Sequence, residues 1–264
     1  MNDCEIFLSR LADKTDLYCE LSKKIGLCSD VNDIPKLFDS LPSPLNIKVF
    51  VSNENTENAE LDNIISCLKT CSENHSFNIE IIKDEFLNII DSEDRITSES
   101  KPRSVIHRDG DIHPTVHIWI IKRMDMGIYV LLQKRSSSKD THPDCYDVSA
   151  AGHVIQGSEF RDSAVKELYE ELGIKLPPEK LDFIGIQKKN SSENLNGTEI
   201  RDNEMSAVYL CHENIKIEDL NINPDEVADV GWAEIDELLS IMKKNDFKHC
   251  LITEELFKIK KAVY

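Results

Sequence analysis

Hydrophobic side chains in the first third of the chain follow two different periods. From Phe7 to Ile25 they recur at near-helical intervals and stop at Gly26, which predicts a long amphipathic helix with a glycine stop. The pattern then predicts a short helix from Asp33 with Pro35 in its first turn, a strand over 47–51, a helix over 57–71 and a strand over 77–82. The last three elements have the order of a βαβ unit.

The rest of the chain predicts more strands than helices. An apolar segment at 85–91 precedes a polar, serine-rich stretch over 92–104, which we expect to be a loop or a hairpin arm. Strands are predicted over 115–121, 129–133, 181–186 and 203–210. Helices are predicted between Gly157 and Gly173 and over 235–242, and a polar loop over 190–197 is expected to border a substrate cleft. Such an order predicts an α/β (α+β) fold with a mixed sheet between helices, divided into domains at 1–83 and 84–264.

Composition and charge restrict the classes of function. The 264 residues are 40% hydrophobic and 30% charged, enough for a buried core, so the chain is not a disordered protein. A net charge of −18 repels polyphosphate backbones, which argues against a nucleic-acid partner and favours a small molecule. No apolar run approaches the roughly 20 residues of a membrane-spanning helix.

Cysteine usage indicates a reducing compartment. The eight cysteines include no Cys-x-x-Cys pair, and no cleavable signal stands at the N-terminus, so we expect free buried thiols and a cytoplasmic protein. Residues 1–83 carry no catalytic constellation. A role for them in homodimer formation or in covering the substrate is left open.

Three glutamates provide the main chemical signal. Glu167, Glu170 and Glu171 stand at positions i, i+3 and i+4 of a predicted helix, so their carboxylates converge within one turn. Ligands that are all oxygen suit Mg²⁺ or Mn²⁺, and such a cation typically binds a phosphate. The alternative is a solvated amphipathic surface helix with its apolar residues inward. The flanking glycines favour the metal site, because Gly152 and Gly157 precede the helix and Gly173 ends it.

The spacing resembles the Nudix box, which runs Gly, five residues, Glu, seven residues, Arg-Glu, an aliphatic, any residue, Glu-Glu, any residue, Gly and an aliphatic. Two positions depart from it. Ser158 stands where the first glutamate belongs, with Glu159 one residue late, and Lys166 replaces the arginine. The matching residues are Gly152, Glu167, Leu168, Glu170, Glu171, Gly173 and Ile174. The resemblance implies a Nudix α/β/α sandwich and a metal site that includes the Gly152 carbonyl.

The flanks of the box are similar to the Nudix branch related to isopentenyl diphosphate isomerase. The similar stretches are 130–139 and 146–153, and the resemblance runs from about Asp84 onward. It implies that Arg135 and Lys139 lie over the substrate diphosphate, where cationic donors neutralise phosphoryl oxygens. His153 is implied at the substrate as well. Without that comparison, a basic patch at the end of a strand is the alternative for the two cations.

The same comparison argues against isomerase chemistry. The true isomerases have a cysteine two residues before the histidine that matches His153, and that cysteine takes part in proton transfer. Here the position is Ala151, and a methyl group neither donates nor accepts a proton. Cys145 lies too far along the chain to be an obvious replacement.

The resemblance also implies two further features. His113 and His153 match histidines that hold a metal in the isomerases, and with His107 and Asp202 they define a candidate second metal site that would favour a transition metal. The alternative for each histidine is an ordinary hydrogen-bonding role in a β-rich region. Glu204, at the start of a predicted strand, resembles the extra carboxylate that many Nudix hydrolases use as a metal ligand or a base.

Together these features predict an enzyme. The favoured hypothesis is a Mg²⁺-dependent (or Mn²⁺-dependent) Nudix hydrolase that cleaves a diphosphate linkage in a small nucleoside-diphosphate-type or other organic diphosphate. Glu167, Glu170, Glu171 and Glu204 are its catalytic candidates. The alternatives are an isomerase-like enzyme, which Ala151 disfavours, and a catalytically weak diphosphate-binding protein, which Ser158 keeps open.

Overall fold

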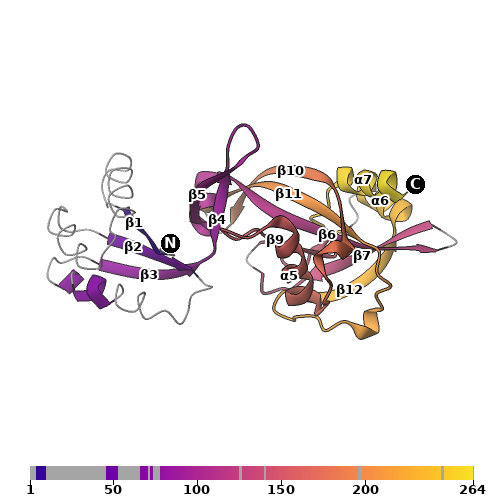
Figure 1. Ribbon diagram of the computed structural model, residues 1–264, viewed down its shortest axis with the longest axis horizontal. Coiled ribbons are helices and arrows are strands. Elements are labelled where there is room, and N and C mark those ends of the chain that lie inside the picture. Colours follow the sequence, from indigo (N-terminus) through magenta and orange to yellow (C-terminus); the bar gives the residue numbers. More distant parts are fainter. Residues whose placement is uncertain are drawn as a thin grey trace. The chain divides into compact units, whose positions relative to one another are not determined.

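The structure is a computed structural model in which the chain forms two units (Figure 1). One unit comprises Met1–Phe86 with Lys101–Val105, and the other Leu87–Ser100 with Ile106–Tyr264. That residues 1–83 fold as an independent domain stays a prediction. The residues that the structure describes are 4–9, 46–52, 66–70, 72–73, 78–124, 127–139, 141–195, 198–244 and 247–263.

A three-stranded sheet forms the first unit. β1 (Cys4–Ser9) pairs antiparallel with β2 (Asn46–Ser52), which pairs parallel with β3 (Asn78–Asp84). The predicted strands at 47–51 and 77–82 are confirmed, and residues 66–70 of the predicted intervening helix are helical. Their parallel pairing is that of the expected βαβ unit.

The long helix predicted from Phe7 is wrong at its start. Phe7 lies within β1, opposite Lys48 of β2, and the strand continues to Ser9. Strand pairing satisfies the backbone N–H and C=O groups of these residues, and this tertiary pairing overrides a weak helical periodicity. The remainder of that predicted helix, from residue 10 to 25, and the short helix predicted from Asp33 lie outside the described residues.

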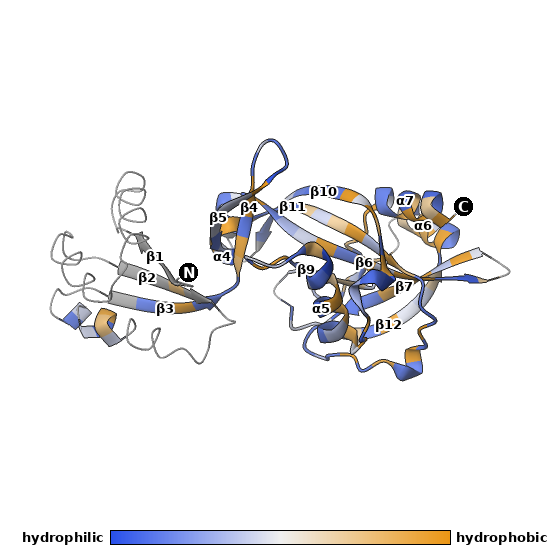
Figure 2. Ribbon diagram, in the orientation of Figure 1, coloured by the Kyte–Doolittle hydropathy of each residue, from blue (hydrophilic) through white to orange (hydrophobic). Residues whose placement is uncertain are grey.

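The polar stretch after residue 91 is the loop and second arm of a hairpin. β4 (Phe86–Ile90) pairs with β5 (Ile96–Pro102), and the connecting loop is hydrophilic (Figure 2). Asp91 holds the loop, since its carboxylate accepts hydrogen bonds from the backbone N–H groups of Glu93 and Arg95 and pairs with the Arg95 guanidinium. The hairpin is confirmed, whereas the helix that follows it, α4 (Arg103–Asp109), was not predicted.

A larger mixed sheet forms the second unit, with the strand order β10-β11-β6-β7-β12. β11 and β6 are parallel, and the other neighbouring pairs are antiparallel. Two short strands pair with its middle, β8 (Tyr146–Asp147) with β7 and β9 (Ala150–His153) with β6. The five main strands are β6 (Ile112–Met124), β7 (Gly127–Arg135), β10 (Leu181–Leu195), β11 (Thr198–Cys211) and β12 (Val227–Glu234).

Alternate residues of the central strands face different helices. Val116 and Ile118 of β6 pack in one buried cluster with Leu168 of α5 (Phe160–Leu172). Trp119 packs in a second cluster with residues of α6 (Ile235–Lys244) and α7 (Thr253–Val263). Side chains alternate along a strand, so the clusters lie on opposite faces of the sheet. The predicted α+β fold with a mixed sheet between helices is confirmed (Figure 1).

The loop predicted over 190–197 is wrong as far as the structure describes it. β10 continues to Leu195 and stays paired with β11, from Asn190 opposite Asn203 to Leu195 opposite Thr198. Ser192 and Glu193 are exposed, so the polar composition belongs to a solvated hairpin arm rather than to a loop. Residues 196 and 197 lie outside the description.

A buried ion pair attaches α7 to the sheet. The Glu255 carboxylate, fully buried, accepts hydrogen bonds from His117 Nδ1 at 2.7 Å and from Trp119 Nε1 at 2.8 Å. Burial opposes a charge on His117, but the adjacent Glu255 outweighs it and raises the histidine pKa to about 9. Burial likewise opposes the charge on Glu255, but His117 and Trp119 lower its pKa below the usual value. The two groups are therefore charged together at neutral pH.

Replacing Glu255 by alanine should lower the free energy of unfolding by about 3 kcal/mol near pH 6, because the partner charge stays buried. The contribution of His117, whose pKa is raised, is complete below its ordinary value of 6.5 and is lost as the pH rises through about 9. The contribution of Glu255, whose pKa is lowered, is complete above 4.5 and is lost in acid. Urea unfolding at several pH values measures both the loss of stability at high pH and the loss in acid.

Glu254→Ala is the matched control, since Glu254 precedes Glu255 on α7 and is exposed. It should cost about 0.5 kcal/mol or less. A Glu255→Ala loss that is the same at pH 6 and well above pH 9 would contradict the buried ion pair.

Candidate functional site

Helix α5 presents the three glutamates on its second half. The helix begins after Glu159, whose backbone is extended, and ends at Gly173, whose φ of 72° is left-handed. A Cβ at Gly173 would lie 2.8 Å from the Asn221 Cβ, so both the backbone angle and the space require glycine. The inward packing of Leu168 and Leu172 fixes how the helix is rotated against the sheet.

The three carboxylates have different surroundings. Glu171 is buried, and its Oε2 accepts hydrogen bonds from Gln133 Nε2 and from the Ala151 N–H, both at 3.2 Å. Glu167 is half-buried, whereas Glu170 is exposed with the Lys166 Nζ at 3.9 Å. The helix therefore turns Glu167 and Glu171 toward the sheet and leaves Glu170 at its solvent side.

Glycine at position 152 lets the Glu167 carboxyl lie against strand β9. A Cβ added to Gly152 would lie 2.2 Å from Glu167 Cδ and 2.3 Å from Oε1, well inside any allowed contact. The carboxyl thus fills the space that a side chain at residue 152 would need. Gly152, Glu167 and Glu171 meet where β9 passes under α5.

Electrostatics at this junction favour a cation. Burial raises the pKa of Glu171 well above its usual value, and the neighbouring Glu167 raises it further, while the Ala151 N–H acts in the opposite direction. A divalent cation would offset both costs, because it replaces the lost hydration and separates two like charges. The donors at the junction are carboxylate and backbone oxygens, which fit Mg²⁺ or Mn²⁺.

The two cationic candidates lie among other acidic residues. The Arg135 guanidinium pairs with Asp147 at 3.3 Å and donates to the Thr141 carbonyl at 3.1 Å, and the Lys139 ammonium pairs with Glu226. Asp147 and Glu226 both contribute to the raised pKa of Glu171, so both ion pairs lie within electrostatic range of the helix. Each cation has a carboxylate partner in this structure, and a phosphate would compete with it.

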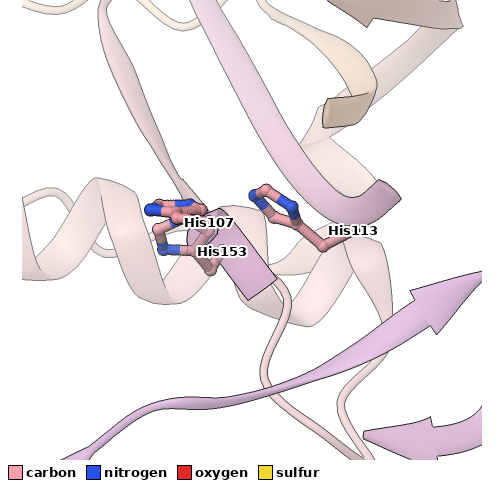
Figure 3. A group of neighbouring side chains, drawn as sticks. All are labelled: His107, His113 and His153. Carbon is pink, nitrogen blue, oxygen red and sulfur yellow. The ribbon is translucent and has the colours of Figure 1, made fainter. Parts of the chain in front are cut away.

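The histidine candidates come together from three different elements. His107 of α4, His113 of β6 and His153 of β9 gather their rings in one place, with centroids 5.1 to 5.9 Å apart (Figure 3). Asp202 Oδ1 lies 3.7 Å from His107 Nε2 and 3.8 Å from His113 Nε2. The cluster contains the four residues of the candidate second metal site.

Two members of this histidine cluster, His113 and Asp202, have shifted pKa values. Burial lowers the pKa of His113 to about 4, with a smaller effect of His153, so the imidazole is neutral and keeps a lone pair. Burial opposes the charge on Asp202, but Lys189, 2.7 Å away, outweighs it and lowers the pKa to about 2. A neutral imidazole beside a carboxylate is a pair of donors that transition metals accept.

Glu204 lies with the histidines. Donor atoms of His113, Asp202 and Glu204 are all within 4.8 Å of one another, and Lys189 Nζ is 3.4 Å from Glu204. The sequence comparison had grouped Glu204 with the α5 glutamates. In the part of the chain that the structure describes, those glutamates are not among the groups of metal donors that come within 4.8 Å.

Sequence reasoning missed several residues of these sites. Lys189 lies opposite Glu204 in the pairing of β10 with β11. Gln133 donates a hydrogen bond to the Glu171 carboxylate, and Glu255 provides the buried carboxylate that accepts one from Trp119. None stands in a recognisable motif, and only the strand register and the packing of α7 bring them to the sites. Ser158, which replaces the first glutamate of the box, and Glu159 beside it are both exposed ahead of the helix, and Lys166, the other departure, is exposed on it.

The sequence model of the NUDIX domain matches residues 111–253, more than half of the 264-residue chain. The chain therefore belongs to the Nudix family. It is 38% identical over 157 residues to an uncharacterized Nudix hydrolase of Clostridium acetobutylicum, covering 60% of this chain and 73% of that protein.

Two further relatives extend the comparison. The chain is 35% identical over 169 residues to Nudix hydrolase 3 of Arabidopsis thaliana, a match that covers 62% of this chain but only 21% of the longer plant protein. It is 26% identical over 165 residues to an isopentenyl-diphosphate Delta-isomerase of Cutibacterium acnes, which covers 60% of this chain and 80% of that enzyme. The Nudix assignment and the likeness to the isomerases are both confirmed.

The protein is thus a Nudix hydrolase, an enzyme class that cleaves diphosphate linkages and generally uses divalent metal ions. No described helix is long and apolar enough to cross a membrane.

Gly152→Ala should reduce kcat/KM for diphosphate hydrolysis by about a hundredfold, because the new methyl group displaces the Glu167 carboxyl from β9. The melting temperature should barely change, since the displaced atoms are the end of a flexible side chain. Gly231→Ala is the matched control, because a Cβ there meets nothing within 4 Å. A Gly152→Ala enzyme as active as the parent would show that this contact does not matter.

Proposed function

We propose that this protein is a Mg²⁺-dependent hydrolase (Mn²⁺ being able to substitute) that cleaves the diphosphate linkage of a small nucleoside-diphosphate-type or other organic diphosphate. The observation that carries the proposal is the burial of the Glu171 carboxyl beside Glu167, with Gly152 making room for the latter. A buried carboxylate beside a half-buried one is unfavourable unless a cation or a proton compensates it. Family membership supports the reaction class.

The side chains around this junction have separable roles. Glu171 is fixed by Gln133 and the Ala151 N–H, which orients its second oxygen. Glu167 supplies a carboxylate against β9, and Glu170 supplies one from the solvent side. A divalent cation held by these residues and the Gly152 carbonyl would neutralise phosphoryl charge and acidify the attacking water.

Arg135 and Lys139 stabilise the phosphoryl oxygens in this proposal. Each would exchange its present carboxylate partner, Asp147 or Glu226, for the substrate diphosphate. Arginine offers a planar, bidentate fork and lysine a compact point charge, so the first is suited to orient a phosphate and the second to neutralise it. His153 follows Gly152 on β9, but its side chain faces the other side of the sheet, so in this proposal it serves the histidine cluster rather than the diphosphate.

The histidine cluster is a second, separate metal site in this proposal. His107, His113, His153 and Asp202 hold a transition metal, and Glu204 contributes a carboxylate to it rather than to the α5 site. Two observations support it. The pKa of His113 is lowered, so its ring is neutral, and the buried atoms His113 Nε2 and Asp202 Oδ1 have no hydrogen-bond partner. Such atoms in an interior call for a ligand.

Isomerase activity is the weaker candidate despite the relatives that carry it. Ala151 lies on β9 opposite His117 and packs against the apolar cluster under α6 and α7. Its methyl group cannot exchange a proton with a substrate. A catalytically weak binding protein remains the third candidate, because the first glutamate of the box is replaced by the exposed Ser158.

A panel of substrates separates the hydrolase, the isomerase and the binding protein. It contains nucleoside triphosphates, nucleoside diphosphate sugars, dinucleoside polyphosphates and prenyl diphosphates. The proposal predicts hydrolysis of at least one of the first three classes into two phosphorylated products, only when Mg²⁺ or Mn²⁺ is present. Glu170→Gln combined with Glu171→Gln should reduce that turnover by at least about a hundredfold, because the amides remove two anionic ligands. Glu179→Gln, an exposed glutamate after the helix, should leave it unchanged.

Two outcomes would refute the hydrolase. One is a double variant that turns over as fast as the parent, and the other is isomerisation of a prenyl diphosphate without hydrolysis of any member of the panel. Metal binding without turnover would favour the binding protein.

A further inference from the structure

We propose that His142, Cys145 and Cys250 form a zinc site that joins the loop after β7 to the segment before α7. One donor atom from each residue, a ring nitrogen or a sulfur, lies within 4.8 Å of the other two. This group shares no residue with the α5 glutamates or with the histidine cluster. Nothing in the Nudix box accounts for it.

Backbone pairing places the two cysteines diagonally across one bridge between their segments. Tyr146 and His249 form a parallel bridge, in which the Tyr146 N–H donates to Lys248 O and the Cys250 N–H donates to Tyr146 O at 2.8 Å. Cys145 and Cys250 are each one residue away from that bridged pair. Because successive side chains point to opposite sides of extended backbone, both thiols point to the same side. Their proximity therefore follows from the fold of both segments.

The loop brings His142 to the thiols from within the same turn. The Cys145 N–H donates a hydrogen bond to His142 O at 3.4 Å, and the Arg135 N–H donates one to the Cys145 carbonyl oxygen at 2.9 Å. His142 Nδ1 is 3.7 Å from Glu193 Oε1 at the tip of the β10 arm. In metal sites the ring nitrogen that does not bind the ion commonly faces a carboxylate, which orients the ring and raises its basicity.

The donor types select zinc. Two thiolates and an imidazole are softer ligands than Mg²⁺ or Mn²⁺ accepts, and Zn²⁺ binds this combination in a tetrahedron with water in the fourth position. Zinc–sulfur bonds of about 2.3 Å place two sulfurs roughly 3.8 Å apart, so the present separations need a contraction of about 1 Å at most. Each thiol loses its proton to solvent on binding.

The location of the site would let a bound zinc ion cross-link two segments of the chain. The loop carries Lys139, directly follows Arg135 and, apart from residue 140, is described throughout. Cys250 lies three residues before α7, the helix whose Glu255 is paired with His117 in the interior. A zinc ion would thus hold together two segments that are far apart in sequence, next to the ion pair of Arg135 and Asp147.

Titration of the metal-free, reduced protein with Co²⁺ tests the proposal, because thiolate ligation gives cobalt a charge-transfer band that oxygen and nitrogen ligands do not. The full chain should develop this band to the intensity of one thiolate-bound cobalt ion per chain, whether or not the histidine cluster binds a second ion, and Zn²⁺ should remove it by displacement. Cys145→Ser combined with Cys250→Ser should abolish the band. Cys67→Ser, a partly exposed cysteine in the other unit, is the matched control and should keep it.

Two further readouts guard against a variant that merely misfolds. Zn²⁺ should slow alkylation of Cys145 and Cys250 in the unmodified protein at least tenfold, with no change at Cys67. His142→Ala, which keeps both thiols, should weaken cobalt binding without abolishing the band. The proposal is overturned if the parent shows no thiolate band, if the band survives in the double serine variant, or if zinc leaves the alkylation of both cysteines unchanged.

Discussion

The packing of α5 against β9 is the constraint on which the proposed catalytic site depends. It buries one carboxyl, Glu171, and brings a second, Glu167, against the backbone of Gly152, where a methyl group would not fit. Two like charges in an interior are unfavourable unless a cation or a proton compensates them. The apolar contacts of Leu168 and Leu172 impose this arrangement on the carboxyls. The fold thereby makes the ionised form of Glu171 unfavourable, and a bound divalent metal ion would offset that cost.

The large sheet separates chemically different donor sets. Gly152 faces α5, whereas its neighbours on β9, Ala151 and His153, face the other side because side chains alternate along a strand. Carboxylates therefore meet under α5, and imidazoles meet with Asp202 and Glu204 across the sheet. The same alternation carries His117 and Trp119 to Glu255, which connects the histidine-bearing strand β6 to α7. The paired strands β6 and β9 thus position a group of carboxylates on one face of the sheet and a group of imidazoles on the other.

Much of the fold could be predicted from the sequence, because the box helix, the hairpin after residue 85 and the central strands have strong periodicity and clear glycine punctuation. The start of the first helix and the 190–197 loop could not, since strand pairing with β2 and β11 decides both. Motif spacing was enough to name the glutamates and the histidines. The position of Glu204, the partners Lys189 and Gln133, and the approach of Cys145 to Cys250 depend on register between distant strands, which a single sequence does not reveal.

Direct metal binding tests the central claim most sharply. Calorimetric titration of the full chain with Mn²⁺ should show one binding event that requires a non-hydrolysable diphosphate analogue. This event should be lost in the Glu167→Gln, Glu171→Gln double variant and kept in His113→Ala. The histidine variant separates the α5 site from the cluster on the other face of the sheet. Binding that persists unchanged in the double glutamine variant, or no binding to the parent at millimolar Mn²⁺, would contradict the account.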